Sequence, residues 1–139
     1  MKVSASRELL APRADVWRFL AEPYHLSDWW PGIAGVRPDR RGLARGARWE
    51  VRGSDRPTLF RGAEGEGMLL VHEVEEPRRV TWHLTRGRLD VEVTLEETAP
   101  DRTLATVVVR GRLLVGWNRS LPQRALARLH ALIQTAAGL

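Results

Sequence analysis

The sequence predicts an α+β fold in which seven antiparallel strands form one curved sheet around a long C-terminal helix. Three observations support this prediction: a strand pattern before Pro12, a run of strand patterns from Ile33 to Arg112, and a single long amphipathic helix at the end. Two short helical segments lie between the first strand and the second. The expected order is strand, two helices, six strands and helix, in a single domain over residues 1–139.

The length and composition are typical of an ordinary globular domain. The chain has 139 residues, of which 43% are hydrophobic and 28% charged, and this length is enough to bury a sizeable core. No apolar run approaches the roughly 18 residues that a membrane span needs, and the first residues lack the apolar stretch of a signal peptide. We therefore expect a cytoplasmic protein. Cysteine is absent, which excludes disulfides and thiolate metal sites.

The basic residues allow two interpretations. The formal net charge is +5, and all but one of the 22 basic residues are arginine. One interpretation is a phosphate-contacting patch for nucleic acid; the other is a solvated hairpin edge that discourages strand pairing. Elsewhere the arginines are interleaved with acids, so no nucleic-acid partner is expected. The densest basic stretch consists of Arg37, Arg40, Arg41, Arg45 and Arg48.

The first elements are defined by alternation and by prolines. Apolar and polar residues alternate from Val3 to Leu9, which is typical of a strand. Apolar side chains then recur at helical spacing from Pro12 to Glu22, and a proline suits the first turn of a helix. A second short helical segment, His25 to Trp30, ends before Pro31. Neither helix is long enough to be stable alone, so both must pack on a larger element.

Six strand patterns follow, separated by turns rich in glycine, proline or charge. The clearest alternates apolar and polar residues from Leu89 to Glu96, as expected for a strand with one face in water. A long loop is expected over Gly53 to Gly67. The predicted strands are Ile33 to Asp39, Ala47 to Arg52, Met68 to Glu75, Val80 to Arg86, Leu89 to Glu96 and Thr103 to Arg112.

The last segment predicts the longest helix. Ser120 and Gln123 have the spacing of a capping box, and Gly138 provides a stop. About 18 residues with a rise of 1.5 Å each span about 27 Å, which is enough to cross a sheet. The apolar positions that repeat at helical spacing are Leu121, Ala125, Leu129, Leu132, Ile133 and Ala136.

Three segments resemble the START-like or SRPBCC superfamily of Bet v 1-like proteins. They are Ala11 to Pro23, with its proline-started helix and Val-Trp pair; Leu26 to Gly32, with its Trp-Trp-Pro ending; and the hairpin Val71 to Trp82. The chain is most similar to the polyketide cyclase/dehydrase and lipid transport family. The resemblance covers nearly the whole chain and implies a helix-grip fold with a cavity between the sheet and the terminal helix. It does not imply a reaction.

Strand alternation predicts which side chains line that cavity. If Trp82 faces inward with Val80 and Leu84, then Leu70, His72 and Val74 share the inner face across the hairpin. One interpretation is an apolar ligand pocket with few polar groups; the alternative is that the aromatic residues simply fill the core. The candidate ligand-binding residues are Trp30, Trp49, Met68, Leu70, His72, Trp82, Leu84, Val91, Val93, Leu129 and Ile133.

Histidine is the natural candidate for acid–base chemistry, and the pattern places only His72 inside. His72 is therefore the one weak catalytic candidate, although an inward histidine is more often a hydrogen-bonded core residue. The sequence contains no histidine pair at metal-ligand spacing and no phosphate-binding or nucleophile motif. We expect neither a metal nor a cofactor.

Three functional hypotheses remain open. The first is a binding or carrier protein for a hydrophobic small molecule such as a lipid, an isoprenoid or a polyketide. The second is an enzyme similar to polyketide cyclases or aromatases, which needs a positioned acid or base and an oxyanion-stabilising donor, with His72 and either Arg7 or Arg110 as candidates. The third is a protein-interaction module that resembles the activators of the Hsp90 ATPase. A monomer or a homodimer is expected in each case.

Overall fold

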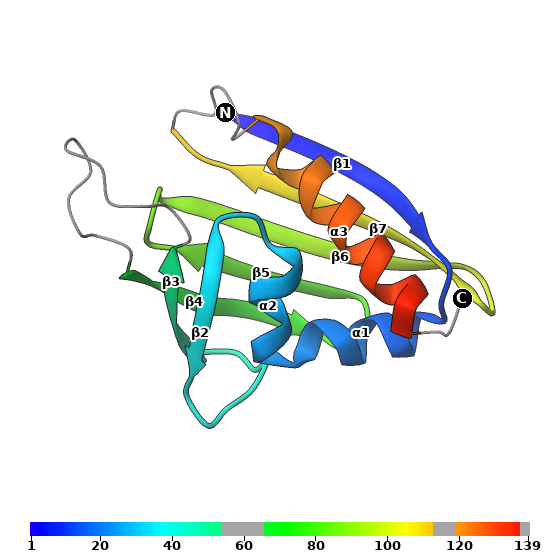
Figure 1. The fold of residues 1–139 in the computed structure, drawn as a ribbon, viewed down its shortest axis with the longest axis horizontal. Helices are drawn as coiled ribbons and strands as arrows, with labels where there is room; N and C mark the ends of the chain where they lie inside the picture. The colour runs from blue at the N-terminus through cyan, green and yellow to red at the C-terminus, as the bar shows by residue number, and fades with distance from the viewer. Residues whose placement is uncertain (54–65, 113–118, 137–139) are drawn as a thin grey trace.

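The computed structural model describes residues 1–53, 66–112 and 119–136. One seven-stranded antiparallel sheet carries the α-helices on one face, and the long helix α3 packs over β1 and β7 (Figure 1). The elements are β1 (Lys2–Leu9), α1 (Arg13–Ala21), the short 3-10 helix η1 (Pro23–His25), α2 (Leu26–Trp29), β2 (Ile33–Pro38), β3 (Arg48–Gly53), β4 (Glu66–Glu75), β5 (Arg79–Leu84), β6 (Leu89–Ala99), β7 (Arg102–Arg110) and α3 (Leu121–Ala136).

The predicted fold class and the predicted order of elements are confirmed. The strands lie in the order β1-β7-β6-β5-β4-β3-β2, so β1 pairs with β7 while every other strand pairs with its neighbours in the sequence. Strands β1 and β2 are therefore the two edges of an open sheet. Residues 54–65 of the predicted loop, and the predicted stop of the last helix at Gly138, lie outside the described residues. None of the described helices is long and apolar enough to cross a membrane.

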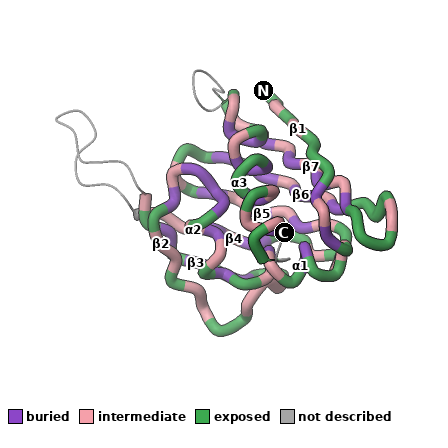
Figure 2. Tube along the Cα trace, turned by 45° about the vertical axis from the view of Figure 1, so that its right-hand side comes forward, coloured by how far each residue is buried: buried purple, intermediate pink, exposed green. Residues whose placement is uncertain are grey.

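The core lies between the inner face of the sheet and the helices (Figure 2). Strand β7 shows how the chain forms it: Thr103, Ala105, Val107 and Val109 are fully buried, while the residues between them are only half-buried. The sequence alone does not reveal this facing, because both sides of the strand carry apolar or threonine side chains. The residues that α3 contributes to the core are Leu121, Ala125, Leu126, Leu129 and Ile133.

Strand β4 contains a β-bulge that changes which side chains face inward. Val71 lies opposite Trp82, but Glu73 lies opposite Thr81, so His72 is the extra residue on β4. Leu69 and Val71 are therefore the buried residues before the bulge.

The predicted inward facing of Met68, Leu70 and His72 is wrong. His72 is exposed, and Met68 and Leu70 are only half-buried on the outer face. Val74, which follows the bulge, packs against the core as predicted. The error arises because one inserted residue moves every earlier side chain of the strand to the opposite face. Four consecutive apolar residues, 68–71, hide the change of face in the sequence.

Candidate functional site

Three tryptophans meet at the inner face of the sheet. Trp29 and Trp30 come from the end of α2, and Trp82 comes from the middle of β5. Their ring centroids are 5.5 Å apart for Trp29 and Trp30, 6.1 Å for Trp29 and Trp82, and 5.7 Å for Trp30 and Trp82, and all three pairs pack edge to face. Edge-to-face packing is the favourable arrangement for aromatic pairs. The cluster forms a large apolar surface at the junction between α2 and the sheet.

Trp82 carries a polar group that has no partner. Its indole Nε1 is buried, and the described part of the chain offers no acceptor within hydrogen-bond distance. Trp49, on β3, differs in this respect because its Nε1 donates to the carbonyl oxygen of Gly42 at 3.2 Å. A buried donor without an acceptor costs about 1–3 kcal/mol. Trp82 thus places one unpaired N–H group in an otherwise apolar environment.

Most of the predicted pocket residues belong to this buried region. They lie in one hydrophobic cluster, so their inward facing is as predicted, while contact with a ligand stays a prediction. Met68, Leu70 and His72 are the exceptions, because the bulge in β4 turns them outward. The predicted residues within the cluster are Trp30, Trp49, Trp82, Leu84, Val91, Val93, Leu129 and Ile133.

The buried surface is almost entirely apolar. Thr103 is the one described buried residue with a hydroxyl or charged side chain, and its Oγ1 donates to the carbonyl oxygen of Ala11 at 2.8 Å. This hydroxyl is used to join β7 to the segment before α1. The described interior is therefore apolar, with a single buried hydroxyl that is already hydrogen-bonded.

None of the four histidines is buried. His25 stacks on Phe19 with ring centroids 4.0 Å apart, and its Nδ1 lies 2.8 Å from the Phe19 carbonyl oxygen, so it joins α1 to η1. His72 and His83 lie on the outer face of the sheet with their rings 6.3 Å apart. His72, the predicted acid–base residue, therefore lies on the opposite side of the sheet from the tryptophan cluster. Within the described ranges, no group of three or more acidic or histidine side chains is placed to hold a metal ion.

His130, on α3, is half-buried beside a cation. Arg7 of β1 donates from Nη2 to His130 Nδ1 at 3.4 Å. Burial and the nearby Arg7 charge lower the pKa of His130 below its usual value of 6.5. Because the folded state disfavours protonation, its contribution to stability is fully present above about pH 6.5 and is lost as the pH falls from there through the lowered pKa.

We expect a His130→Gln variant to show a weaker loss of stability than the wild type between about pH 7.5 and pH 5.5. Thermal unfolding followed by circular dichroism across this range measures the difference. An Arg7→Gln variant, which keeps the burial but removes the neighbouring charge, should fall between the two. Identical pH profiles for the wild type and His130→Gln would show that protonation of this imidazole does not oppose folding.

The arginine-rich hairpin between β2 and β3 is partly neutralised. Arg37 lies 3.7 Å from Glu50, Arg41 lies 4.0 Å from Asp39, and Arg45 lies 4.0 Å from Glu73. Asp39 also accepts hydrogen bonds from the backbone amides of Arg48 and Arg41, of which the Arg48 amide contributes most to lowering its pKa. These contacts favour a solvated, internally paired hairpin edge over a free phosphate-binding patch.

Comparison with known proteins supports the fold and the family resemblance. A family model described as "Polyketide cyclase / dehydrase and lipid transport" matches residues 1–135. No curated protein matches the sequence.

Several solved structures share the architecture. A protein from Nitrosospira multiformis superposes with a TM-score of 0.74 at 16% identity, covering 100% of both chains. A protein from Nitrosomonas europaea has a TM-score of 0.72 at 19% identity, covering 100% of this chain and 97% of the other. The Aha1 dimer from Colwellia psychrerythraea has a TM-score of 0.67 at 13% identity, covering 97% of this chain and 95% of that one. At these identities the similarities establish the fold alone.

Proposed function

Because the chain belongs to the polyketide cyclase/dehydrase and lipid transport family, we propose that it binds a hydrophobic small molecule between the inner face of the sheet and α3. The family description includes both lipid transport and chemistry on polyketides, so it supports a small apolar ligand without selecting a reaction. The apolar character of the buried face favours binding over acid–base catalysis. Lipids, isoprenoids and polyketides all have the required chemistry.

The unpaired N–H of Trp82 is the observation that carries this proposal. Trp29 and Trp30 surround Trp82 with apolar surface, so an oxygen that accepts a hydrogen bond from Nε1 belongs to a mostly apolar molecule. A ligand carbonyl or ether oxygen would satisfy the donor and remove its desolvation cost. The proposed ligand is therefore an apolar molecule with at least one hydrogen-bond acceptor, bound against the tryptophan cluster.

We expect a Trp82→Phe variant to lose its preference for ligands that carry an acceptor. A fluorescent dimethylaminonaphthalene with a propionyl group is a suitable probe, and the same compound with a propyl group lacks the carbonyl. The wild type should bind the ketone about fivefold more tightly than its propyl analogue, since a net hydrogen bond is worth about 1 kcal/mol. Trp82→Phe should bind both compounds equally. Fluorescence titration measures the two affinities.

Trp49→Phe is the matched control for this experiment. It removes the same indole N–H from a neighbouring part of the core, but this N–H already has the Gly42 carbonyl as its partner. The control should keep the ketone preference. It should also lose more stability than Trp82→Phe, because it breaks a formed hydrogen bond. If neither compound binds to the wild type, or if the two variants change the preference equally, the proposal is wrong. Native mass spectrometry of freshly purified protein is an independent test, because a co-purified ligand would add its mass to that of the chain.

A further inference from the structure

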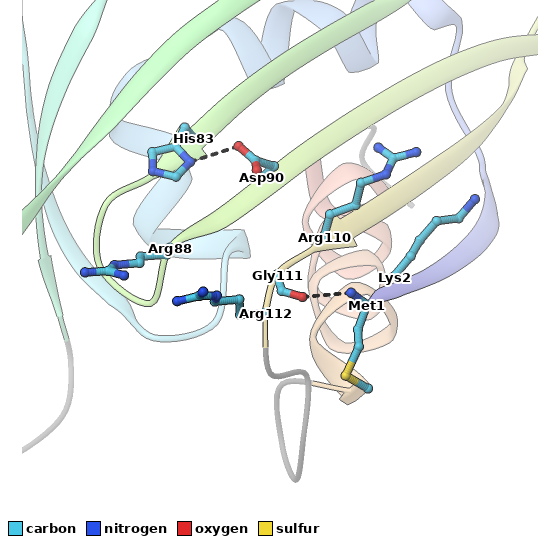
Figure 3. A pocket seen from close by; sticks show the side chains of 8 residues that line it. All are labelled: Met1, Lys2, His83, Arg88, Asp90, Arg110, Gly111 and Arg112. Carbon is cyan, nitrogen blue, oxygen red and sulfur yellow. Dashed lines mark hydrogen bonds and ion pairs between the residues drawn. The ribbon is translucent and has the colours of Figure 1, made fainter.

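A pocket lies on the outer face of the sheet, on the opposite side from the tryptophan cluster. An open pocket of about 590 Å³ is formed where β5 and β7 end and β6 and β1 begin (Figure 3). The amino group of Met1 donates to the carbonyl oxygen of Gly111 at 3.0 Å and closes one side of it. The lining residues are Met1, Lys2, His83, Arg88, Asp90, Arg110, Gly111 and Arg112.

Strand register brings the pocket's side chains together. His83 lies directly opposite Asp90, and Asp90 lies opposite Arg110. Arg110 in turn lies opposite Lys2 on the edge strand β1. Their sequence neighbours Leu84, Leu89 and Val109 are buried on the inner face, so this row of side chains faces outward.

The pocket contains an excess of unpaired positive charge. Four cationic side chains line it, Lys2, Arg88, Arg110 and Arg112, against the single carboxylate of Asp90. Asp90 Oδ1 is already in contact with His83, 2.8 Å from its Nδ1. Within the part of the chain that the structure describes, none of the four cations has an ion pair or a side-chain hydrogen bond. They differ in this from the paired arginines of the β2–β3 hairpin.

The backbone at Arg88 gives a second indication. Arg88 has a φ of 52°, in the left-handed region where glycine or asparagine is favoured over an arginine. Gly87, just before it, also has a positive φ of 80°. The turn therefore contains an arginine in a backbone conformation that is unfavourable for this residue, and the side chain of this arginine lines the pocket.

We propose that this outer pocket binds the phosphate groups of a small anionic ligand. The guanidinium fork matches phosphate oxygens in a bidentate geometry. Figure 3 shows Arg88 and Arg112 on one side of the pocket, and Arg110 and Lys2 on the other. A ligand with two linked phosphates offers more acceptor oxygens to these cations than a single phosphate does. The volume is within the 300–1,000 Å³ range of small-molecule sites. These four cations line a single hollow, whereas nucleic-acid binding is expected to need an extended basic stripe.

Isothermal titration calorimetry of the full chain with pyrophosphate and with ADP tests the proposal directly. A C-terminal tag keeps the Met1 amino group free to bond Gly111. We expect saturable binding of one ligand per chain, tighter for pyrophosphate than for orthophosphate, and weakened by salt. The double variant Arg88→Asn/Arg110→Gln should reduce the affinity by at least about tenfold, because hydrogen bonds between charged groups are stronger than those between neutral groups. Asparagine suits the positive φ at position 88, so the variant should fold.

The double variant Arg40→Gln/Arg128→Gln is the matched control. It removes the same charge from exposed arginines outside the pocket and should leave the affinity within about twofold. Equal losses in both variants would show that net charge alone attracts the anion and would overturn the proposal. So would equal affinity for sulfate, which would indicate an adventitious ion only, or tighter binding of an oligonucleotide that increases with its length.

Two further measurements distinguish a soluble phosphate ester from a lipid headgroup as the source of the phosphate. Binding of pyrophosphate and ADP in solution indicates a free phosphate ester. Binding only to vesicles that contain phosphatidic acid, and not to vesicles of neutral lipid, indicates a lipid headgroup. Absence of all of these interactions would overturn the proposal. Because the pocket lies on the opposite face from Trp82, Trp82→Phe should leave phosphate binding unchanged, so the two sites fail or succeed independently.

Discussion

A Val107→Lys variant is expected to lose most of its folding stability, whereas Val108→Lys, one position along the same strand, is expected to fold normally. Val107 is fully buried at the centre of β7, opposite Ala5 and Val93. A lysine there has no buried carboxylate to pair with, and an unpaired buried charge costs several kcal/mol. Val108 faces outward, opposite Ser4 and Glu92, where a lysine contacts water and a carboxylate.

Urea unfolding followed by far-ultraviolet circular dichroism measures both variants. We expect Val107→Lys to reduce the free energy of unfolding by more than about 4 kcal/mol and Val108→Lys to change it by less than about 1 kcal/mol. Because side chains alternate with a period of two, a register shift of one residue would reverse this order. The experiment therefore tests the facing of β7. Similar costs at the two positions would contradict a sheet with one buried face.

Among leucine-to-alanine substitutions on α3, Leu129→Ala should lower the free energy of unfolding the most. Leu129 is fully buried between the helix and the sheet. Removing its branched end forfeits the hydrophobic transfer energy and leaves a cavity, which together cost about 2–5 kcal/mol for buried leucines. The exact cost depends on how far neighbouring side chains collapse into the space. A shift in the urea midpoint with an unchanged slope is the expected result.

Leu132→Ala provides the comparison for Leu129→Ala. It is the same chemical change one turn along the same helix, at a position that is only half-buried. We expect it to cost less than half as much, because it leaves a smaller void. A Leu129→Ala protein as stable as the Leu132→Ala protein would mean that space beside Leu129 is already empty or readily filled. In that case α3 does not pack tightly on the sheet at this point.

The fold was largely predictable because its signals are local. Prolines at positions 12, 23 and 31 end or begin elements, the alternation from Leu89 to Leu95 identifies a strand with one buried face, and the periodicity of the last segment identifies α3. These patterns depend on the chemistry of neighbouring residues, which a sequence displays directly. The family resemblance then supplied the helix-grip arrangement, whereas the long-range pairing of β1 with β7 was not predicted and comes from the structure.

The inner face was less predictable at β4. Residues 68–71 are all apolar, so the alternation that reports facing is absent there, and the bulge at His72 is invisible. The prediction assumed strict alternation backward from the inward-facing Val74, and this placed His72 on the inner face. Because of this single inserted residue, His72, the one predicted acid–base residue, lies on the outer face of the sheet. Bulge positions depend on pairing with the partner strand, which local patterns do not record.

The outer pocket was missed for a different reason. Its cations come from three separate parts of the chain, at Lys2, at Arg88 and at Arg110 with Arg112. Counting charge along the sequence instead points to the hairpin between β2 and β3, where acidic partners are also nearby. Predicting which distant residues become neighbours requires the order of the strands in the sheet. Predicting whether an arginine is paired requires its contacts in the folded structure. The glycine followed by arginine at Gly87 and Arg88 was the one local signal available.

The position of β1 determines the order in which the chain completes its sheet. Ser6 Oγ and Thr106 Oγ1 are hydrogen-bonded at 2.7 Å although 100 positions separate them, while the other strands meet partners adjacent in sequence. Closing so long a segment is entropically costlier than forming a hairpin, and folding slows as contacts become more distant in sequence. During synthesis β1 precedes its pairing partner β7 by about 100 residues, so the two strands cannot pair until β7 has been made. We expect the hairpins from β2 to β7 to form before β1 pairs with the open edge of β7.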